Sequence, residues 1–135
     1  MSDAIYPAAK TAFLTGQLDW LSDPIVCVLV GTAGYTYSAN HVSLADVPIA
    51  SRIAVSGTLT HPTVALGVVD ADDTSFGTVS GDTVSAVILC KNTGTDIASP
   101  LIAYMDQALT GLPLTPNGTP ITITWSSGLS KIFAL

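Results

Sequence analysis

Two short stretches of the chain are apolar at nearly every position, residues 25–30 and residues 84–90. A strand that is apolar on both of its sides is expected in the middle of a sheet, where both faces are covered. Ten polar or turn-forming residues follow the second stretch, and a further apolar run begins at Leu101. Residues 92–94, Asn-Thr-Gly, tolerate the positive φ angles of a turn. The pattern therefore predicts an antiparallel hairpin over residues 82–105 at the centre of the core.

Three other stretches, residues 52–56, 63–69 and 121–125, alternate between apolar and polar positions. A period of two is typical of a half-buried strand. Two shorter strands are expected over residues 76–79 and 129–135, and residues 106–119 are expected to form a long loop because they are dense in Gly, Pro and Asn. The alternation predicts that the following side chains face inward: Ile53, Val55, Val64, Leu66, Val68, Ile121, Ile123 and Trp125.

One stretch has the spacing of a helix, residues 6–21. Pro7 suits a first helical turn, and Gly16 is expected to end the helix. The pattern also predicts one helical turn over residues 41–47, with Asn40 as its cap. The side chains expected on the inner side of the N-terminal helix are Tyr6, Ala9, Phe13 and Leu14.

Counting these elements gives about eight short strands separated by turn signals, which is typical of a β-sandwich or barrel. The acidic residues agree, because the chain has ten acids, all of them Asp, and helical surfaces usually draw on Glu. We therefore expect a single all-β domain over residues 1–135, mainly antiparallel. Residues 1–22 would form a short helical segment that packs on the domain or extends from it.

Charged residues are scarce, at 10% of the chain against about 25% in typical soluble domains. Either Ser and Thr cover the outer faces, or part of the apolar surface is buried against other subunits. The net charge is −6 and only four residues are basic, so a nucleic-acid partner is not expected. No apolar run is long enough to cross a membrane as a helix, so a membrane partner is not expected either.

The sequence offers few candidates for chemistry. Asp70, Asp72 and Asp73 could supply oxygen ligands to a cation, although Asp is also a common turn residue. His41 and His61 are too isolated in sequence to suggest a zinc site. No nucleophile or phosphate-binding motif is present, and we expect no catalytic residue, metal or cofactor.

Cys27 and Cys90 both lie within the continuous apolar stretches. A thiol there behaves as a small hydrophobic group, and we expect two buried free thiols made in a reducing compartment. A disulfide between them stays open at this point, because two neighbouring strands could bring them together.

Aromatic residues outside the strands are the candidates for a contact surface, since Tyr and Trp are favoured at interfaces. Tyr35 and Tyr37 could either pack over a sheet edge or contact a partner. Trp20 lies near a turn, where it could be exposed and could stack on a sugar. The candidate interface residues are Tyr6, Phe13, Trp20, Tyr35, Tyr37, Pro113 and Pro116.

The chain resembles a family of small structural proteins of tailed bacteriophages and prophages. The matching stretches span almost the whole sequence: IYP at residues 5–7, GQLDWLS at 16–22, YTYS at 35–38, VSG at 55–57, VDADD at 69–73, KNTG at 91–94, LIAY at 101–104, GLP at 111–113, TPNG at 115–118 and KIF at 131–133.

The resemblance implies a head decoration, or cement, protein on the outer surface of the capsid, or another small component of the virion. It implies no catalytic residues. Its expected partners are the major capsid protein and further copies of the chain, most simply as a homotrimer, assembled after synthesis in the cytoplasm of the bacterial host. The alternatives are a tail or head-to-tail connector component and a carbohydrate-binding module of the phage adhesion apparatus.

Overall fold

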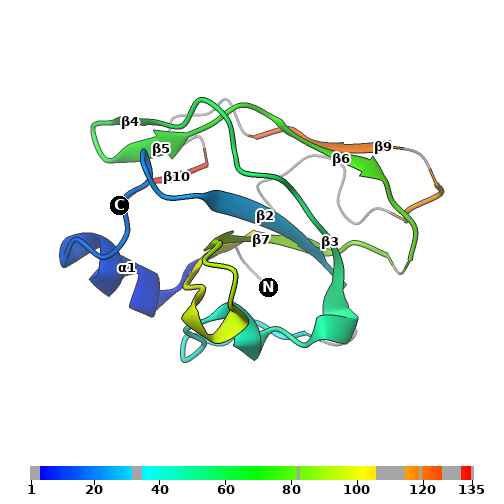
Figure 1. Ribbon diagram of the computed structural model, residues 1–135, viewed down its shortest axis with the longest axis horizontal. Coiled ribbons are helices and arrows are strands. Elements are labelled where there is room, and N and C mark those ends of the chain that lie inside the picture. The colour runs from blue at the N-terminus through cyan, green and yellow to red at the C-terminus, as the bar shows by residue number, and fades with distance from the viewer. Residues whose placement is uncertain are drawn as a thin grey trace.

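The computed structural model describes residues 4–31, 35–81, 83–105, 115–118, 120–125 and 132–134. In this part of the chain the strands form sheets of five, three and two strands, and every pairing is antiparallel. The two smaller sheets form a layer over the five-stranded sheet (Figure 1), and none of the sheets closes on itself. The prediction of a mainly antiparallel all-β fold is confirmed, with the sheets layered as in a sandwich and no closed barrel.

The five-stranded sheet has the order β1-β8-β7-β2-β3, the three-stranded sheet β10-β5-β4 and the two-stranded sheet β6-β9. A single α-helix and three short 3₁₀ turns complete the described part. The bounds are β1 Ala4–Ile5, α1 Pro7–Leu14, β2 Ile25–Val30, η1 Leu44–Asp46, η2 Ile49–Ser51, β3 Arg52–Val55, β4 Thr63–Ala65, β5 Val68–Asp70, β6 Thr74–Thr78, β7 Ala86–Lys91, η3 Asp96–Ala98, β8 Leu101–Met105, β9 Pro120–Ile123 and β10 Phe133–Ala134.

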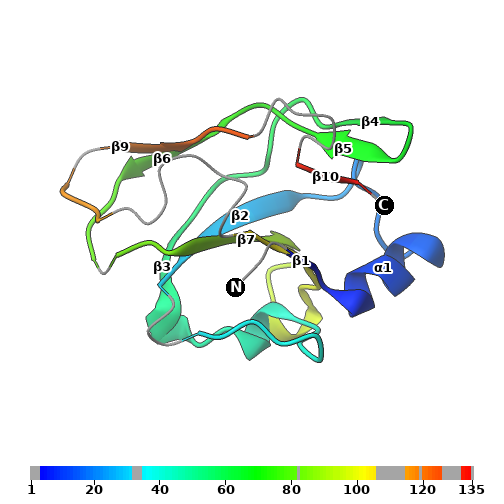
Figure 2. The ribbon, with the colours of Figure 1, turned by 180° about the vertical axis from the view of Figure 1, so that it is seen from behind.

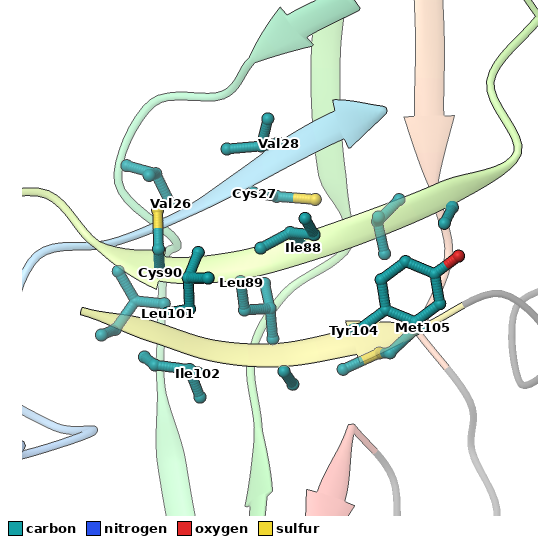
Figure 3. Packing of buried hydrophobic residues seen from close by; sticks show 14 of the residues in the cluster. Val26, Cys27, Val28, Ile88, Leu89, Cys90, Leu101, Ile102, Tyr104 and Met105 are labelled. Carbon is teal, nitrogen blue, oxygen red and sulfur yellow. The ribbon is translucent and has the colours of Figure 1, made fainter. Parts of the chain in front are cut away.

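The strands β2, β7 and β8 form the centre of the core, as the continuous apolar runs predict. Every residue of β2 and β8 is buried, and so is every residue of β7 except Lys91. Ile88 lies across from Val28 on one side and Tyr104 on the other, and Figure 3 shows these side chains packed together. The layer of small sheets covers one face, while α1 and the 3₁₀ turns lie on the other (Figure 1).

The loop between β7 and β8 turns as predicted. Gly94 has φ +87°, and its amide donates a 3.0 Å hydrogen bond to the side-chain oxygen of Asn92. Such a bond, from a backbone N–H to an Asn two residues earlier, forms a local turn. The hairpin over residues 82–105 is therefore confirmed, with Asp82 itself outside the described residues.

The prediction of one strand over residues 63–69 is wrong, because β4 and β5 form a hairpin there. Leu66 and Gly67 both have positive φ, +52° and +79°, as the two-residue turns of tight hairpins require. The turn places Val64 across from Val69. As a result Val69 is buried and Val68 only partly so. The predicted inward positions of Val64 and Leu66 are wrong, because Val64 is 46% exposed and Leu66 stands fully exposed at the tip.

The predicted inward register is also wrong for Val55, which is 53% exposed. It ends β3, an edge strand with a neighbour on one side only, while Ile53 in the same strand is half-buried and packs on the core. The predicted inward register is confirmed in β9 and in the two residues that follow it. Ile121, Ile123 and Trp125 are buried, and the threonines between them are exposed.

The helix α1 is shorter than the stretch that predicts it, and it stops before Gly16, which has φ +79°. Ala9 is buried and Phe13 is half-buried, but Leu14 is 84% exposed, so its predicted inward position is wrong. Residues four apart lie about 40° apart around a helix, whereas the five residues from Ala9 to Leu14 turn it about 140° away. None of the helices in the described part is long and apolar enough to cross a membrane.

The helical turn predicted over residues 41–47 is present as η1, but Asn40 is not its cap. The carboxylate of Asp46 accepts hydrogen bonds from the backbone amides of Val42 and Ser43, at 2.8 and 3.1 Å. The residue at the cap position is Ser43, and an acidic side chain three residues later that accepts from the cap residue's amide is one half of a capping box. These two bonds hold the pKa of Asp46 below its usual value.

The two cysteines are free and buried, as predicted. The register places Val26 across from Cys90, and neighbours along a strand point to opposite faces. The side chain of Cys27 therefore points away from the face that carries Cys90, and the register leaves no geometry for a disulfide. Burial raises the pKa of Cys90 to about 12 and raises that of Cys27 as well.

Candidate functional site

The structure removes three of the predicted interface residues from the surface. Tyr6 is 0% exposed, and Trp20 and Tyr35 are each 3% exposed, so their side chains belong to the core. The role of these three side chains is therefore packing within the core, and not contact with a partner as predicted. Phe13, Tyr37 and Pro116 are half-buried, and Pro113 lies outside the described residues.

All four tyrosines of the chain gather in one cluster. Tyr37 stacks at a tilt against Tyr6, with ring centroids 5.0 Å apart, and Tyr104 of β8 lies beside both Tyr35 and Tyr37. The hydroxyls of Tyr6 and Tyr35 are 2.6 Å apart, and that of Tyr35 is 2.9 Å from Nδ1 of His41. Of the two interpretations of Tyr35, packing is therefore the one that holds, because its hydroxyl group is hydrogen-bonded inside the protein.

Burial, followed by its bond to Tyr35, raises the pKa of Tyr6, and burial also raises the pKa of Tyr35. Both hydroxyls therefore stay protonated through the physiological range. The cluster joins the start of α1, the loop after β2 and strand β8, three segments that are far apart in sequence. We assign it the role of fixing that loop against the sheet.

Trp20 is held by a hydrogen bond of 3.0 Å from its indole Nε1 to the backbone oxygen of Asp70. Its ring also meets the edge of Phe133 in β10, at a centroid distance of 5.5 Å. A sugar-stacking platform needs an exposed ring face. Trp20 presents none, so the residue that motivated a carbohydrate-binding module does not support it.

The acidic turn at residues 70–73 is built into local structure. The carboxylate of Asp72 bonds to Nδ1 of His61 and to the hydroxyl of Thr60, and these bonds hold its pKa below the usual value. Asp73 accepts a 3.1 Å hydrogen bond from the amide of Trp125. Within the described ranges, no group of three or more His, Cys, Asp or Glu side chains is arranged to hold a metal ion.

A groove of about 280 Å³ lies between residues 56–60 and 73–75 and is lined largely by hydroxyl groups. Most of these groups already bond within the chain. The Ser56 hydroxyl donates to the oxygen of Gly57 and accepts from the amide of Cys27, while Thr60 donates to Asp72. The hydroxyl of Thr74 is buried and has no partner. Most of the hydroxyl groups that line the groove are thus already hydrogen-bonded within the chain.

The exposed apolar side chains are the feature that distinguishes the surface. In the described part of the chain, the large apolar residues at least 46% exposed are Leu14, Leu21, Val42, Ile49, Val55, Val64, Leu66 and Ile97. Three of them belong to or adjoin the 3₁₀ turns, which lie together on the side of the five-stranded sheet away from the small sheets (Figures 1 and 2). We call this surface the three-turn face, made by the exposed residues Val42, Ala45, Pro48, Ile49, Ala50, Ile97 and Ala98.

The side chain of Arg52 links the segments that form the three-turn face. Its guanidinium donates to the backbone oxygens of Leu44, at 2.6 Å, and Val47, at 2.7 and 3.0 Å. It also forms a 2.8 Å ion pair with Asp96 at the start of η3. The amide of Leu44 in turn donates to the oxygen of Ser99. Segments 42–52 and 96–101 are therefore one rigid unit, which holds its apolar side chains outward.

Sequence reasoning missed this face. Residues 42–50 show neither a period of two nor a sustained helical period, so the pattern predicts one turn and assigns no inner or outer side. One feature of the sequence could have indicated an apolar surface here, which is the lack of charge, since Asp46 is the sole charged residue among those nine.

No protein-family model matches the chain, and none of the curated proteins compared with it matches either.

Proposed function

We propose that this chain is a non-enzymatic structural protein of a tailed-bacteriophage particle, a decoration protein that stabilises the capsid by bridging subunits of the major capsid shell. It would be present in many copies on the outer surface of the head, comparable in number to the subunits of the major capsid protein. The likeness of its sequence to small phage structural proteins motivates the proposal.

The observation that carries it is the exposed apolar surface of a chain that is poor in charge. Eight large apolar side chains stand at least 46% exposed among the described residues, and only 14 residues of 135 are charged. Burying one such side chain contributes roughly 1.5–3 kcal/mol, so covering several of them would make an assembled state strongly favourable. Surfaces of this kind mark contacts between proteins.

The rest of the structure supports a role in assembly. The core runs through β2, β7 and β8 without a polar interruption, and the tyrosine cluster and Arg52 hold the loops against it. A rigid body binds with a small entropic cost, because few side chains and loops have to become ordered.

The composition of purified particles tests the proposal. We expect quantitative mass spectrometry to find the chain in particles at a copy number of the same order as the major capsid protein. Particles that lack it should release their DNA at lower temperature, and adding the purified chain should restore the original value. A copy number about tenfold lower would instead indicate a tail or connector component, since such structures hold few subunits. Absence from particles would overturn both assignments.

A further inference from the structure

Two exposed apolar surfaces of the chain carry opposite charges. The exposed Asp46 adjoins Ala45 of the three-turn face, and Asp96, which pairs with Arg52, is 48% exposed beside Ile97. The outer side of α1 carries Leu14, which is 84% exposed, and Lys10 one helical turn before it. Residues four apart lie next to each other on a helix, so Lys10 and Leu14 form one small basic and apolar surface.

We propose that these two surfaces bind each other between copies of this chain. Leu14 of one copy packs against Ile49 and Ile97 of the next, and the ammonium group of Lys10 pairs with the carboxylate of Asp46. This inference rests on the proposed structural function, because it names the contact through which the decoration protein assembles with itself.

Charge decides which surfaces meet. Each copy carries a net charge of −6, so two copies repel each other unless opposite charges face across the contact. The three-turn face against itself would oppose Asp46 with Asp46, and α1 against itself would oppose Lys10 with Lys10. The pairing of the two unlike surfaces is the one that brings a base to an acid.

The two surfaces are also rigid and adjacent. Arg52 fixes the three-turn face, while the amide of Tyr6 donates a 3.0 Å bond to the oxygen of Ile102 and anchors the start of α1 to β8. Both surfaces flank the same side of the five-stranded sheet (Figures 1 and 2). A contact between unlike surfaces repeats around a ring until it closes, or is reciprocated across a twofold axis, and it leaves the layer of small sheets free.

Sedimentation velocity of the purified full-length chain over a range of concentrations tests the contact. We expect a concentration-dependent oligomer. Ile49→Gln on the three-turn face, or Leu14→Gln on α1, should each weaken association about tenfold, because each removes a buried apolar side chain from the contact. The matched control is Leu66→Gln, which changes an even more exposed leucine at the tip of the β4–β5 hairpin and should leave association unchanged.

A charge cycle tests the pairing itself. Asp46 is unsuitable for substitution because its carboxylate caps η1, but the exposed Ala45 beside it can carry a base. Lys10→Glu and Ala45→Lys should each weaken association about three- to fivefold, and the double variant should recover most of that loss. All these positions are exposed, so unchanged melting temperatures verify the fold of each variant.

A chain that is monomeric at every concentration would overturn the inference, as would a double variant no better than its parents or a Leu66→Gln variant as weak as Ile49→Gln. These results are separate from the particle experiment. A monomeric chain that is abundant in particles overturns the self-contact and leaves the proposed function standing. A chain that forms the oligomer but is absent from particles overturns the function and leaves the contact.

Discussion

The central hairpin and the three-turn face are both apolar, yet one is the most buried part of the molecule and the other is exposed. In β7, five consecutive residues from Ala86 are buried, while Ile49 and Ile97 on the turns are 75% and 77% exposed. The difference lies in how each region satisfies its backbone. Strands β7 and β2 pair on both edges, so neighbouring strands take up their polar groups and other layers can cover both faces.

The 3₁₀ turns belong to no sheet, and the side chain of Arg52 donates to two backbone oxygens at η1, those of Leu44 and Val47. That side chain lies beneath the turns and is 13% exposed, so it occupies the inner side. The apolar side chains of η2 and η3 are left on the outer side. The comparison shows that apolar content alone does not decide burial, because Ile49 and Ile97 are as apolar as the buried residues of β7 and yet are exposed.

The largest expected effect is the difference in stability between two variants that carry the same substitution, one in the central strand and one on the three-turn face. Ile88→Asp places a charge without a partner in the central strand and should destabilise the fold by about 4 kcal/mol or more, enough to prevent folding. Ile49→Asp, on the three-turn face, should keep the melting temperature within a few degrees of the unmodified chain. Circular dichroism of the soluble fraction would measure both. Soluble Ile88→Asp protein with unchanged melting would contradict the central position of β7.

An intermediate effect is expected from Arg52→Ala. The variant loses the bonds to Leu44 and Val47 and the ion pair with Asp96, so the free energy of unfolding should fall by about 2–4 kcal/mol. The oxygen of Leu44 keeps the amide of Val47 as a donor, whereas the oxygen of Val47 loses the donors that Arg52 supplies. Hydrogen exchange should increase first in residues 42–52 and 96–101, while β2 and β7 stay protected. Lys10→Ala is the matched control, because it removes an exposed cation. Equal loss of protection in β7 and in the turns would show that the face is not a separate unit.

The smallest expected effect concerns Leu66, an exposed apolar residue that does not belong to the surface held by Arg52. Leu66 has φ +52° and is fully exposed, so both its conformation and its surroundings are unfavourable for folding. Leu66→Asn should stabilise the fold by roughly 0.5–1 kcal/mol, because Asn tolerates positive φ. Gly67→Ala, at φ +79°, should destabilise it. Urea denaturation would detect either change, and a loss of stability in Leu66→Asn would contradict this account of the turn.

Interface residues could not be recognised from residue type alone. Tyr6, Trp20 and Tyr35 have the composition expected of a contact surface, but each finds a hydrogen-bond partner inside the protein, respectively Tyr35, the oxygen of Asp70, and Tyr6 with His41. Trp20 meets Asp70 across 50 positions of sequence and Tyr6 meets Tyr35 across 29. No local pattern reports contacts at such separations, whereas the apolar period of β9 is local and predicts Trp125 as buried.

The sequence by itself determined the all-β class, the central strands and the hairpin between β7 and β8, because a run of apolar residues and a turn motif act over a few neighbouring positions. The opposite facing of Cys27 and Cys90, the burial of three of the four tyrosines and the exposed three-turn face were decided by tertiary structure alone. Each depends on strand register or on a bond between distant residues, above all those of Arg52. Burial is a property of the folded arrangement, and a residue's own chemistry sets only the free energy that is gained or lost when that arrangement covers it.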